Sequence, residues 1–288
     1  MRKFVYSFCI IFVTALITSC AGGKTENGTA ASADSLRIVS LNGTVSEILV
    51  GLGMEKNIVG VDVTSTYPES LRSLTQVGHS HNLNTEAIIA LKPAYVISLE
   101  ERGIKPEQAR LLEQAGIRVW IIKQHFSVEG TKDLIRMLAK EFKKDAEAEK
   151  LIATIETEVK ALPVYETKPK VLFVYARGMG SLQVAGDGTA MCEMIRLAGG
   201  IPATEGTVQG FRPLTAESVV GMNPDYILLF DTGLQSLEGP NGLMKVPGVA
   251  QTAAGKNNKF VSMDGQLLSG FGPRLGSALK QLGEAIHK

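Results

Sequence analysis

The sequence has little cysteine, a single tryptophan and almost no net charge. Its 288 residues contain three cysteines, and lysine plus arginine nearly balance aspartate plus glutamate, for a formal net charge of +1. A near-neutral chain of mixed charges lacks the basic surface with which nucleic-acid-binding proteins neutralise phosphates. We therefore expect no nucleic-acid partner.

The first twenty residues have the pattern of an export signal. Arg2 and Lys3 are followed by an apolar run over residues 4–17, and Cys20 follows two small residues. The run is too short and wrongly flanked for a membrane-spanning helix. Its ending, Ile-Thr-Ser-Cys, resembles the lipobox of bacterial lipoproteins, in which the cysteine is acylated. We expect a signal peptide over residues 1–19 and lipidation of Cys20; ordinary cleavage beside an incidental cysteine is the alternative.

Export also limits what the remaining cysteine can do. Cys9 lies in the signal peptide and Cys20 would carry lipid, so Cys192 alone remains and no internal disulfide can form. Zinc sites built from two or four cysteines are excluded for the same reason. Residues 20–35 are small and polar without an apolar period, which predicts a lipid-anchored flexible tether.

Two distant segments repeat one another without a gap. Residues 83–97 read LNTEAIIALKPAYVI and residues 214–228 read LTAESVVGMNPDYIL. Each begins with a helix-start signal, continues as a short apolar helix, breaks at proline and enters a strand. Two such units in separate halves predict two lobes of similar design.

Further strands alternate with helical stretches along both halves. They are predicted at residues 37–41, 57–63, 118–122, 170–176 and 259–263. This alternation predicts an α/β protein of two Rossmann-like lobes with mostly parallel sheets.

A single amphipathic helix is predicted between the two halves. Apolar residues recur at helical spacing over residues 145–165, and Pro163 ends the pattern. We expect an N-terminal lobe over 36–143, a connecting helix over 144–165 and a C-terminal lobe over 166–288, with a ligand cleft between the lobes.

One tyrosine occupies an unusual place. Residues 64–69 read TSTYPE and follow the apolar run IVGVDV, so Tyr67 lies where a strand ends in a loop. Pro68 biases Tyr67 toward an extended backbone. Taken alone, these residues favour a tyrosine that caps a strand end and has no role in ligand binding.

The organisation as a whole resembles a known family. Two α/β lobes, one connecting helix, a lipid anchor and the opening RIVSLNGTVSEILVGLG are similar to the helical-backbone substrate-binding proteins of bacterial ABC importers, which carry siderophores, cobalamin or haem. The resemblance covers residues 36–287. Within this class the segments GVDVTSTYPE, QVGH, GDGTAMCEMIRLAGG and GFRPLTAESVV look most like those of haem-binding proteins.

The resemblance implies a function and partners. It implies an exported, lipid-anchored monomer facing the periplasm or the exterior, which binds ferric haem b (hemin) as cargo and uses no catalytic cofactor. Its partner would be an ABC permease dimer with its ATPase. No acid/base pair or nucleophile constellation in the sequence indicates an enzyme.

The resemblance also assigns residues to the haem site. The tyrosine of the family's Tyr-Pro pair is the axial iron ligand, which corresponds to Tyr67, and the Arg-Pro-Leu segment with Arg212 faces it across the cleft. A phenolate is a hard anionic ligand that suits ferric iron. Arg212 would supply a positive charge and a hydrogen-bond donor.

Three histidines lie near predicted strand ends. His79 and His81 belong to the loop QVGHSHNLN, and His125 follows the strand at 118–122. Each is a candidate sixth ligand, a partner for a haem propionate, or an ordinary solvated histidine. The His-x-His sequence departs from the usual sequence of the family at this point.

Two further elements are candidates for the propionates. The loop GDGTA at 186–190 precedes a helix, where the backbone N–H groups of Gly188 and Thr189 can bind a carboxylate; a simple strand-to-helix turn is the alternative. Arg177 follows a strand and either meets a propionate or lies on the surface.

Binding proteins of this class resemble one another in docking to their permease through one glutamate on each lobe. Glu217 begins the repeated helix of the second half, and Glu107 begins a helix after Pro106 in the first. Glu86 is the alternative that internal symmetry suggests. Favourable placement at a helix N-terminus would explain all three acids without any docking role.

Cobalamin and ferric siderophores are the alternative ligands. Cobalamin binders of this class line the cleft with several tryptophans, whereas Trp120 lies within an apolar strand and is expected to be buried. Binders of catecholate siderophores cluster arginines, for which Arg177, Arg212 and Arg274 are the candidates here.

The lipobox interpretation makes the first prediction. Cys20→Ser should leave an unprocessed or mis-anchored product in cell fractionation, because the acylated thiol is lost. The purified variant should still bind ligand, since the tether separates the anchor from the lobes. Loss of ligand binding in the purified variant would contradict this separation.

Overall fold

The computed structural model describes residues 36–79, 82–100 and 103–288. The predicted signal peptide, Cys20 and the tether at 20–35 lie outside these residues. None of the helices within the described ranges is long and apolar enough to cross a membrane.

The N lobe, which extends from β1 to α4, is built on a parallel sheet with strand order β3-β2-β1-β6-β7. Its strands are β1 (Ile38–Ser40), β2 (Ile58–Val61), β3 (Thr75–Gln76), β6 (Tyr95–Leu99) and β7 (Arg118–Ile122). A small antiparallel hairpin, β4 (Gly78–His79) and β5 (Asn82–Leu83), lies beside it. Its helices are α1 (Gly43–Gly51), α2 (Thr85–Ala90), α3 (Pro106–Gln114) and α4 (Val128–Phe142), with short 3-10 turns η2 (Glu55–Asn57) and η3 (Glu69–Ser73).

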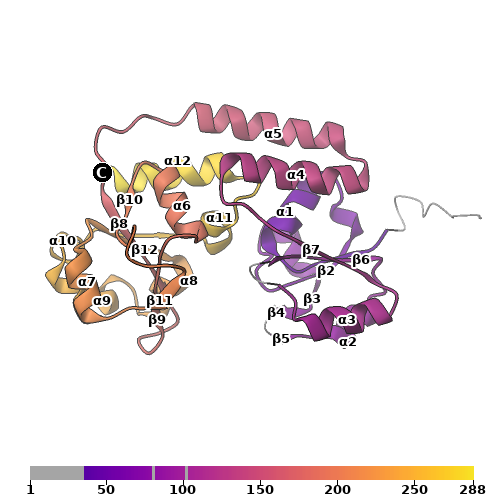
Figure 1. The fold of residues 1–288 in the computed structure, drawn as a ribbon, viewed down its shortest axis with the longest axis horizontal. Helices are drawn as coiled ribbons and strands as arrows, with labels where there is room; N and C mark the ends of the chain where they lie inside the picture. The colour runs from indigo at the N-terminus through magenta and orange to yellow at the C-terminus, as the bar shows by residue number, and fades with distance from the viewer. Residues whose placement is uncertain (1–35, 80–81, 101–102) are drawn as a thin grey trace, which may run out of the picture.

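Alternation along the strands divides the N-lobe core into two layers. Ile38 belongs to the cluster formed with α1, α4 and the helix α5 (Asp145–Lys160), and Val39 belongs to the cluster formed with α2 and α3. Successive side chains of a strand point to opposite faces, so both faces of this sheet must be covered by helices. Figure 1 shows the sheet between these two helical layers.

The C lobe, which extends from β8 to α12, contains a mixed sheet with order β11-β9-β8-β12-β13, and β10 also pairs with β8. Its strands are β8 (Lys170–Ala176), β9 (Leu182–Ala185), β10 (Ile201–Pro202), β11 (Phe211–Pro213), β12 (Tyr226–Phe230) and β13 (Phe260–Met263). β9 pairs antiparallel with both β8 and β11, and the other pairs are parallel. The helices are α6 (Ala190–Leu197), α7 (Ala216–Met222), α8 (Asp231–Ser236), α9 (Pro240–Leu243), α10 (Ala253–Lys256), α11 (Gly265–Ser269) and α12 (Leu275–Ile286), with a 3-10 turn η5 (Val249–Gln251).

The two repeated segments adopt the same local structure. Asn84 and Thr215 cap the N-termini of α2 and α7 with their side chains, and each helix is followed by a strand. Tyr95 of β6 pairs with Ile38, and Tyr226 of β12 pairs with Val171, so each repeat places its strand beside the first strand of its lobe. The predicted two-lobe α/β fold with mostly parallel sheets is thus confirmed, while the antiparallel strand β9 between β8 and β11 was not expected.

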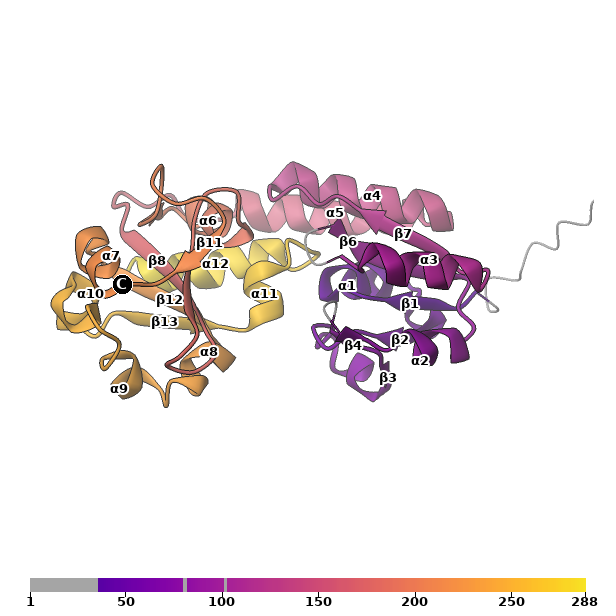
Figure 2. The same ribbon diagram turned by 60° about the horizontal axis from the view of Figure 1, so that its bottom comes forward.

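Helix α5 joins the lobes in chain order. It packs on α4 and α12, as the two ribbon views show (Figures 1 and 2). Ala148 and Ile155 belong to the N-lobe core, whereas Val128 of α4 and Val159 of α5 pack against the cores of both lobes. The hydrophobic interior is therefore continuous from one lobe to the other.

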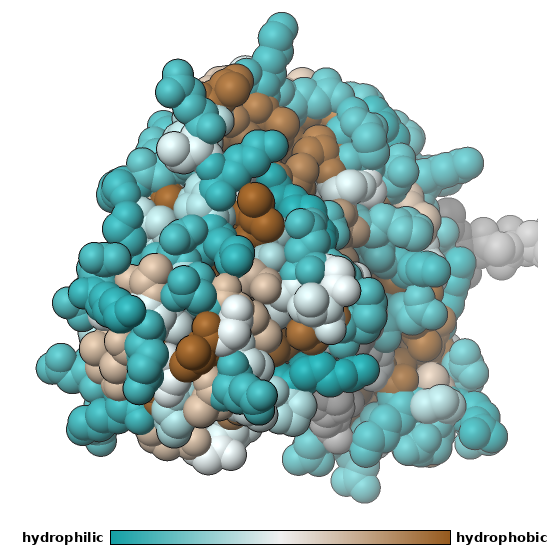
Figure 3. Space-filling view, turned by 60° about the vertical axis from the view of Figure 1, so that its left-hand side comes forward, coloured by the Kyte–Doolittle hydropathy of each residue, from teal (hydrophilic) through white to brown (hydrophobic). Residues whose placement is uncertain are grey.

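The outer end of the C lobe carries scattered apolar residues. Hydrophobic patches on this face are separated by hydrophilic side chains (Figure 3). Val164, which follows α5, is almost completely exposed. Single exposed apolar residues of this kind are common on protein surfaces.

Candidate functional site

The loop that carries Tyr67 begins at a buried aspartate. Asp62 follows β2 and is 2% exposed. Thr64 Oγ1 donates to its Oδ2 at 2.6 Å, and Ser65 Oγ donates to its Oδ1 at 2.8 Å. Burial raises the pKa of Asp62, while these hydrogen bonds and the nearby His79 act in the opposite direction. The side-chain bonds hold the start of the loop against the end of the strand.

Tyr67 lies at the outer end of this loop. Its side chain is 44% exposed, and the peptide bond to Pro68 is cis. In the part of the chain that the structure describes, the Tyr67 hydroxyl makes no hydrogen bond, whereas its backbone N–H and C=O are both bonded. The phenol oxygen is thus presented outward from a loop with a fixed backbone.

A glutamine from the other lobe fixes that backbone. Gln266, in α11, accepts hydrogen bonds at Oε1 from the N–H groups of Thr66 and Tyr67, at 2.8 and 2.9 Å, and from Thr66 Oγ1 at 2.9 Å. Its Nε2 donates to the carbonyl oxygen of Gly43 at 2.9 Å and to Glu47 at 3.2 Å. One C-lobe side chain therefore holds both the Tyr67 loop and the start of α1.

An ion pair lies directly beside this glutamine. The Arg274 guanidinium donates to Glu47 Oε2 at 2.8 Å, and the Arg274 backbone N–H donates to Glu47 Oε1 at 3.2 Å. The Glu47 side chain is only 7% exposed. The same guanidinium carbon lies 3.6 Å from the centroid of the Tyr67 ring, a stacked cation–π contact.

Further polar contacts extend this junction between the lobes. Thr44 Oγ1 donates to the Gly270 carbonyl at 2.7 Å, and Gln124 Nε2 donates to the same oxygen at 2.9 Å. Thr131 Oγ1 donates to the carbonyl oxygen of Phe271 at 3.1 Å, and the Phe271 ring packs on Phe126. The segment from Gln266 to Arg274 is consequently bonded to the N lobe at several points.

Sequence reasoning did not place Glu47 or Gln266 at the candidate site, and it named Arg274 only as one of three arginines that could contact a siderophore. Glu47 carried a usable signal, because a glutamate inside the apolar helix SEILVG requires a cationic partner once it is buried. No local pattern distinguishes Gln266 from other polar residues, and none assigns Arg274 to Tyr67. Only the tertiary structure reveals the contacts of these two residues with the Tyr67 loop.

The histidine candidates occupy different positions. His79 lies in β4 and is half-buried; the neighbouring Gly78 carbonyl accepts from Val63 N–H at 3.1 Å, so β4 runs beside the Tyr67 loop. His125 is exposed and follows β7. His81 lies outside the described residues. Within residues 36–79, 82–100 and 103–288, no group of three or more His, Cys, Asp or Glu side chains is arranged to hold a metal ion.

The arginine candidates of the C lobe lie on its antiparallel edge. Arg212 is an exposed residue of β11, and its guanidinium donates to the carbonyl oxygen of Phe211 at 3.1 Å. Arg177 follows β8 and lies over the Tyr175 ring at 5.4 Å. The Tyr175 ring in turn meets the Phe211 ring edge to face. The structure thus groups two cations with two aromatic rings on this edge.

The GDGTA loop forms a compact turn before α6. Gly188 has a φ of 80°, a backbone conformation that favours glycine. Thr189 caps α6 by accepting from Cys192 N–H, and its hydroxyl donates to the Gly186 carbonyl at 2.7 Å. Asp187 accepts from the Gly206 N–H and pairs with Arg196, and both contacts lower the pKa of Asp187. The Thr189 hydroxyl thus both donates and accepts a hydrogen bond within the turn and the first turn of α6.

The three glutamates considered for docking share one arrangement. Each is exposed and lies in the first turn of a short helix, Glu86 in α2, Glu107 in α3 and Glu217 in α7. A carboxylate at that position also interacts favourably with the helix dipole. The positions of the three glutamates therefore agree both with docking to a permease and with simple stabilisation of the helix N-termini.

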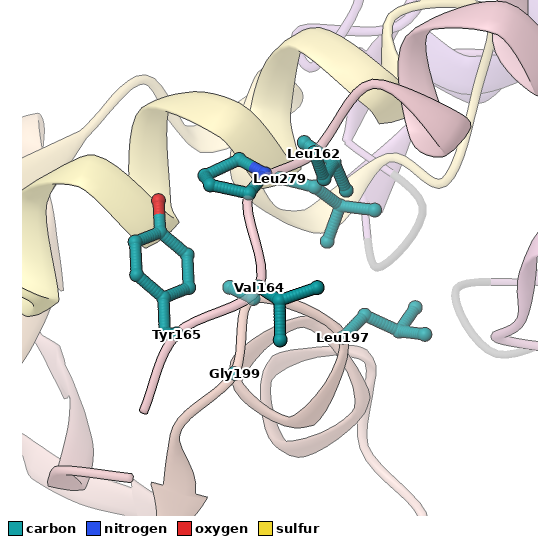
Figure 4. Close-up of a pocket in the computed structure, with 8 residues that line it drawn as sticks. Leu162, Val164, Tyr165, Leu197, Gly199 and Leu279 are labelled. Carbon is teal, nitrogen blue, oxygen red and sulfur yellow. The ribbon is translucent and has the colours of Figure 1, made fainter. Parts of the chain in front are cut away.

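A separate apolar pocket follows α5. It has a volume of about 220 Å³ and lies between the end of α5, α6 and α12 (Figure 4). Its lining includes Leu162, Val164, Leu197 and Leu279. None of the candidate ligand residues contributes to its lining.

Comparison with known proteins identifies a matching family and similar solved structures. The periplasmic binding protein family matches residues 38–267. The structure of the periplasmic heme-binding protein RhuT from Roseiflexus sp. RS-1 superposes with a TM-score of 0.83 at 38% identity, covering 88% of this chain and 98% of RhuT. The heme-binding protein BhuT in complex with two hemes gives a TM-score of 0.80 at 30% identity, over 87% of this chain and 97% of BhuT.

Relatives at lower identity are more varied. The ABC transporter substrate-binding lipoprotein YvrC of Bacillus subtilis is 26% identical over 257 residues, 87% of this chain and 80% of YvrC. The vitamin B12-binding protein of Vibrio vulnificus is 25% identical over 249 residues, 86% of this chain and 89% of that protein. The matched family consists of binding proteins, which confirms the expectation of a binding function rather than an enzyme.

The contacts of Gln266 make the second prediction. Gln266→Ala should speed hydrogen exchange of the Tyr67 amide by roughly five- to tenfold, because one hydrogen bond of about 1 kcal/mol is lost. Gln124→Ala is the matched control, since it removes a bond between the lobes without touching the loop. Equal acceleration in both variants would show that the loop depends on lobe contact in general and not on Gln266.

Proposed function

This chain belongs to the periplasmic binding protein family, and on that basis we propose that it is the substrate-binding component of an ABC importer that captures ferric haem between its lobes and delivers it to the permease. Tyr67 is the proposed iron ligand. Haem is the cargo, and no catalytic cofactor is needed.

The presentation of Tyr67 is the observation that carries this proposal. An exposed phenol without a hydrogen-bond partner in the described residues stands on a loop whose backbone is held from both lobes. A phenolate is a hard anionic oxygen ligand that favours ferric iron. Two solved neighbours above 25% identity, RhuT and BhuT, are heme-binding proteins, which supports the same ligand for this chain.

Other candidate residues receive supporting roles in this proposal. His79 lies beside the Tyr67 loop and is a candidate sixth ligand or propionate partner. Arg212 and Arg177 supply cations for the propionates, and the Phe211 and Tyr175 rings offer an apolar surface to the macrocycle. Three more candidates for contact with the haem are His125, Gly188 and Thr189.

Membrane attachment and an ABC permease partner are also part of the proposal. We propose that acylated Cys20 tethers a monomer to a bacterial membrane, with the lobes in the periplasm or outside the cell. The permease dimer and its ATPase are the proposed partners. The relation to a substrate-binding lipoprotein of an ABC transporter supports both points.

Cobalamin is the principal alternative ligand, and the relation to the vitamin B12-binding protein favours it. Against it, Trp120 is the chain's single tryptophan and is partly buried against the N-lobe core, so the site cannot carry the several tryptophans expected of a cobalamin binder. Absorption spectra of the purified protein with hemin, cobalamin or a ferric siderophore would separate the three ligands.

The ligand assignment makes the third prediction. Tyr67→Phe should abolish the tyrosinate-to-iron charge-transfer band and weaken hemin binding roughly tenfold or more, since a metal–ligand bond is lost. Stability should change by no more than about 0.5 kcal/mol, because the hydroxyl is exposed and no cavity forms. Titration of hemin and chemical unfolding measure the two effects.

A second tyrosine gives the matched control. Tyr95→Phe removes a hydroxyl that donates to Glu141 at 2.6 Å and should leave the hemin spectrum intact. If Tyr67→Phe kept the wild-type spectrum, the ligand would instead be His79, His81 or His125.

Permease docking makes the fourth prediction. Two similar lobes on a twofold permease each present an acidic residue to the same kind of surface. Glu107→Lys with Glu217→Lys should keep hemin affinity but stop uptake, because each reversal costs roughly 2 kcal/mol or more of docking energy. Arginine-to-glutamate changes in the permease should restore uptake.

Surface charge as such requires its own control. Glu113→Lys with Glu284→Lys changes the net charge equally at other exposed sites and should leave uptake unaffected. Wild-type uptake by the Glu107/Glu217 double variant would show that these acids only favour their helix N-termini. Glu86 would then be the next residue to reverse.

A further inference from the structure

The cation in contact with Tyr67 comes from the opposite lobe. Arg274 immediately precedes α12, and its guanidinium carbon lies 3.6 Å from the centroid of the Tyr67 ring. A guanidinium this close to an aromatic ring stacks on its face and is attracted to the π-electrons. The contact covers the ring, while the Tyr67 side chain as a whole stays 44% exposed.

The guanidinium is held in place by Glu47. Both carboxylate oxygens of Glu47 accept from Arg274, one from the guanidinium and one from the backbone N–H. Arg274 Nε is buried and has no hydrogen-bond partner among the described residues. The ion pair and the contact with the Tyr67 ring are thus the interactions of the guanidinium in these residues.

Binding of iron would change the electrostatics of this contact. When the phenol of Tyr67 becomes a phenolate, its ring and oxygen acquire a negative charge beside the guanidinium. A positive charge about 4 Å away stabilises that anion, most strongly where water is excluded. Glu47, which carries the opposite charge, reduces the effect.

We propose that Arg274 is a positioning residue for the Tyr67 ligand, which orients the ring from the opposite lobe and stabilises the negative charge of the iron-bound phenolate. This proposal rests on the proposed function. It assigns charge compensation to Arg274, whereas the family resemblance implied that role for Arg212, whose guanidinium contacts the carbonyl oxygen of its own neighbour Phe211.

A purely structural role for the ion pair makes a different prediction. If Arg274 and Glu47 serve only to join the lobes, removing either partner breaks the same bond and has the same effect on Tyr67. If charge matters, the two removals act in opposite directions. The energy of the phenolate-to-iron charge-transfer band measures this, because a nearby positive charge lowers the energy of the phenolate electrons.

The test compares Arg274→Met and Glu47→Gln as hemin complexes at one pH. The band should move to longer wavelength in Arg274→Met and to shorter wavelength in Glu47→Gln. Hemin transfer to an acceptor protein should be about tenfold faster from Arg274→Met, as expected for loss of a desolvated cation–π contact. Shifts in the same direction, or none in either variant, would overturn the proposal.

Two further variants complete the test. Arg274→Lys keeps the charge and should leave the band nearer to the wild-type position than Arg274→Met does; if Arg274→Met does not fold, Arg274→Lys and Glu47→Gln retain the comparison. Arg212→Met is the matched control for Arg274→Met. A band shift confined to Arg212→Met would overturn the role proposed for Arg274.

Failure of this proposal is distinguishable from failure of the proposed function. If the wild-type complex lacks a band that Tyr67→Phe removes, Tyr67 is not the ligand and both proposals fail. If that band is present but unmoved by the changes at Arg274 and Glu47, only the role of Arg274 fails.

Discussion

The ion pair between Glu47 and Arg274 is the contact around which the polar junction between the two lobes is organised. It joins a nearly buried carboxylate on the first helix to an arginine that immediately precedes the last helix, at 2.8 Å. Removing one partner of a buried pair leaves the other charge uncompensated, which typically costs about 3–5 kcal/mol. Glu47 also accepts from Gln266, so the same carboxylate organises both C-lobe residues that touch the Tyr67 loop.

Close approach of the backbone makes this junction possible. A Cβ atom at Gly43 would lie 2.6 Å from the Thr64 carbonyl oxygen and 2.9 Å from the Gln266 side chain. The absence of a side chain there lets the start of α1, the Tyr67 loop and α11 meet. Helix α5 and the shared contacts of Val128 and Val159 connect the lobes on another side, so two separate sets of contacts oppose their movement.

The consequence for function is that the candidate ligand is a product of both lobes. The N lobe supplies Tyr67 and the hydrogen-bonded base of its loop at Asp62, and the C lobe supplies the glutamine and arginine that fix it. Such a site is largely formed before ligand arrives, which reduces the entropy lost on binding.

The sequence by itself determined the local elements and their order, because these depend on short-range periodicity. Apolar alternation, the repeat at 83–97 and 214–228 and the stop at Pro163 predicted two α/β lobes, and the Tyr-Pro pair after an apolar run placed Tyr67 at a strand end. Strand β11 and the antiparallel pairing of β9 with β8 and β11 were missed, since β11 is a three-residue strand without an alternating apolar pattern. Only the tertiary structure decided that Arg274 lies on the Tyr67 ring. That contact spans more than two hundred residues and arises from the closure of two lobes, for which no local pattern in the chain can provide a signal.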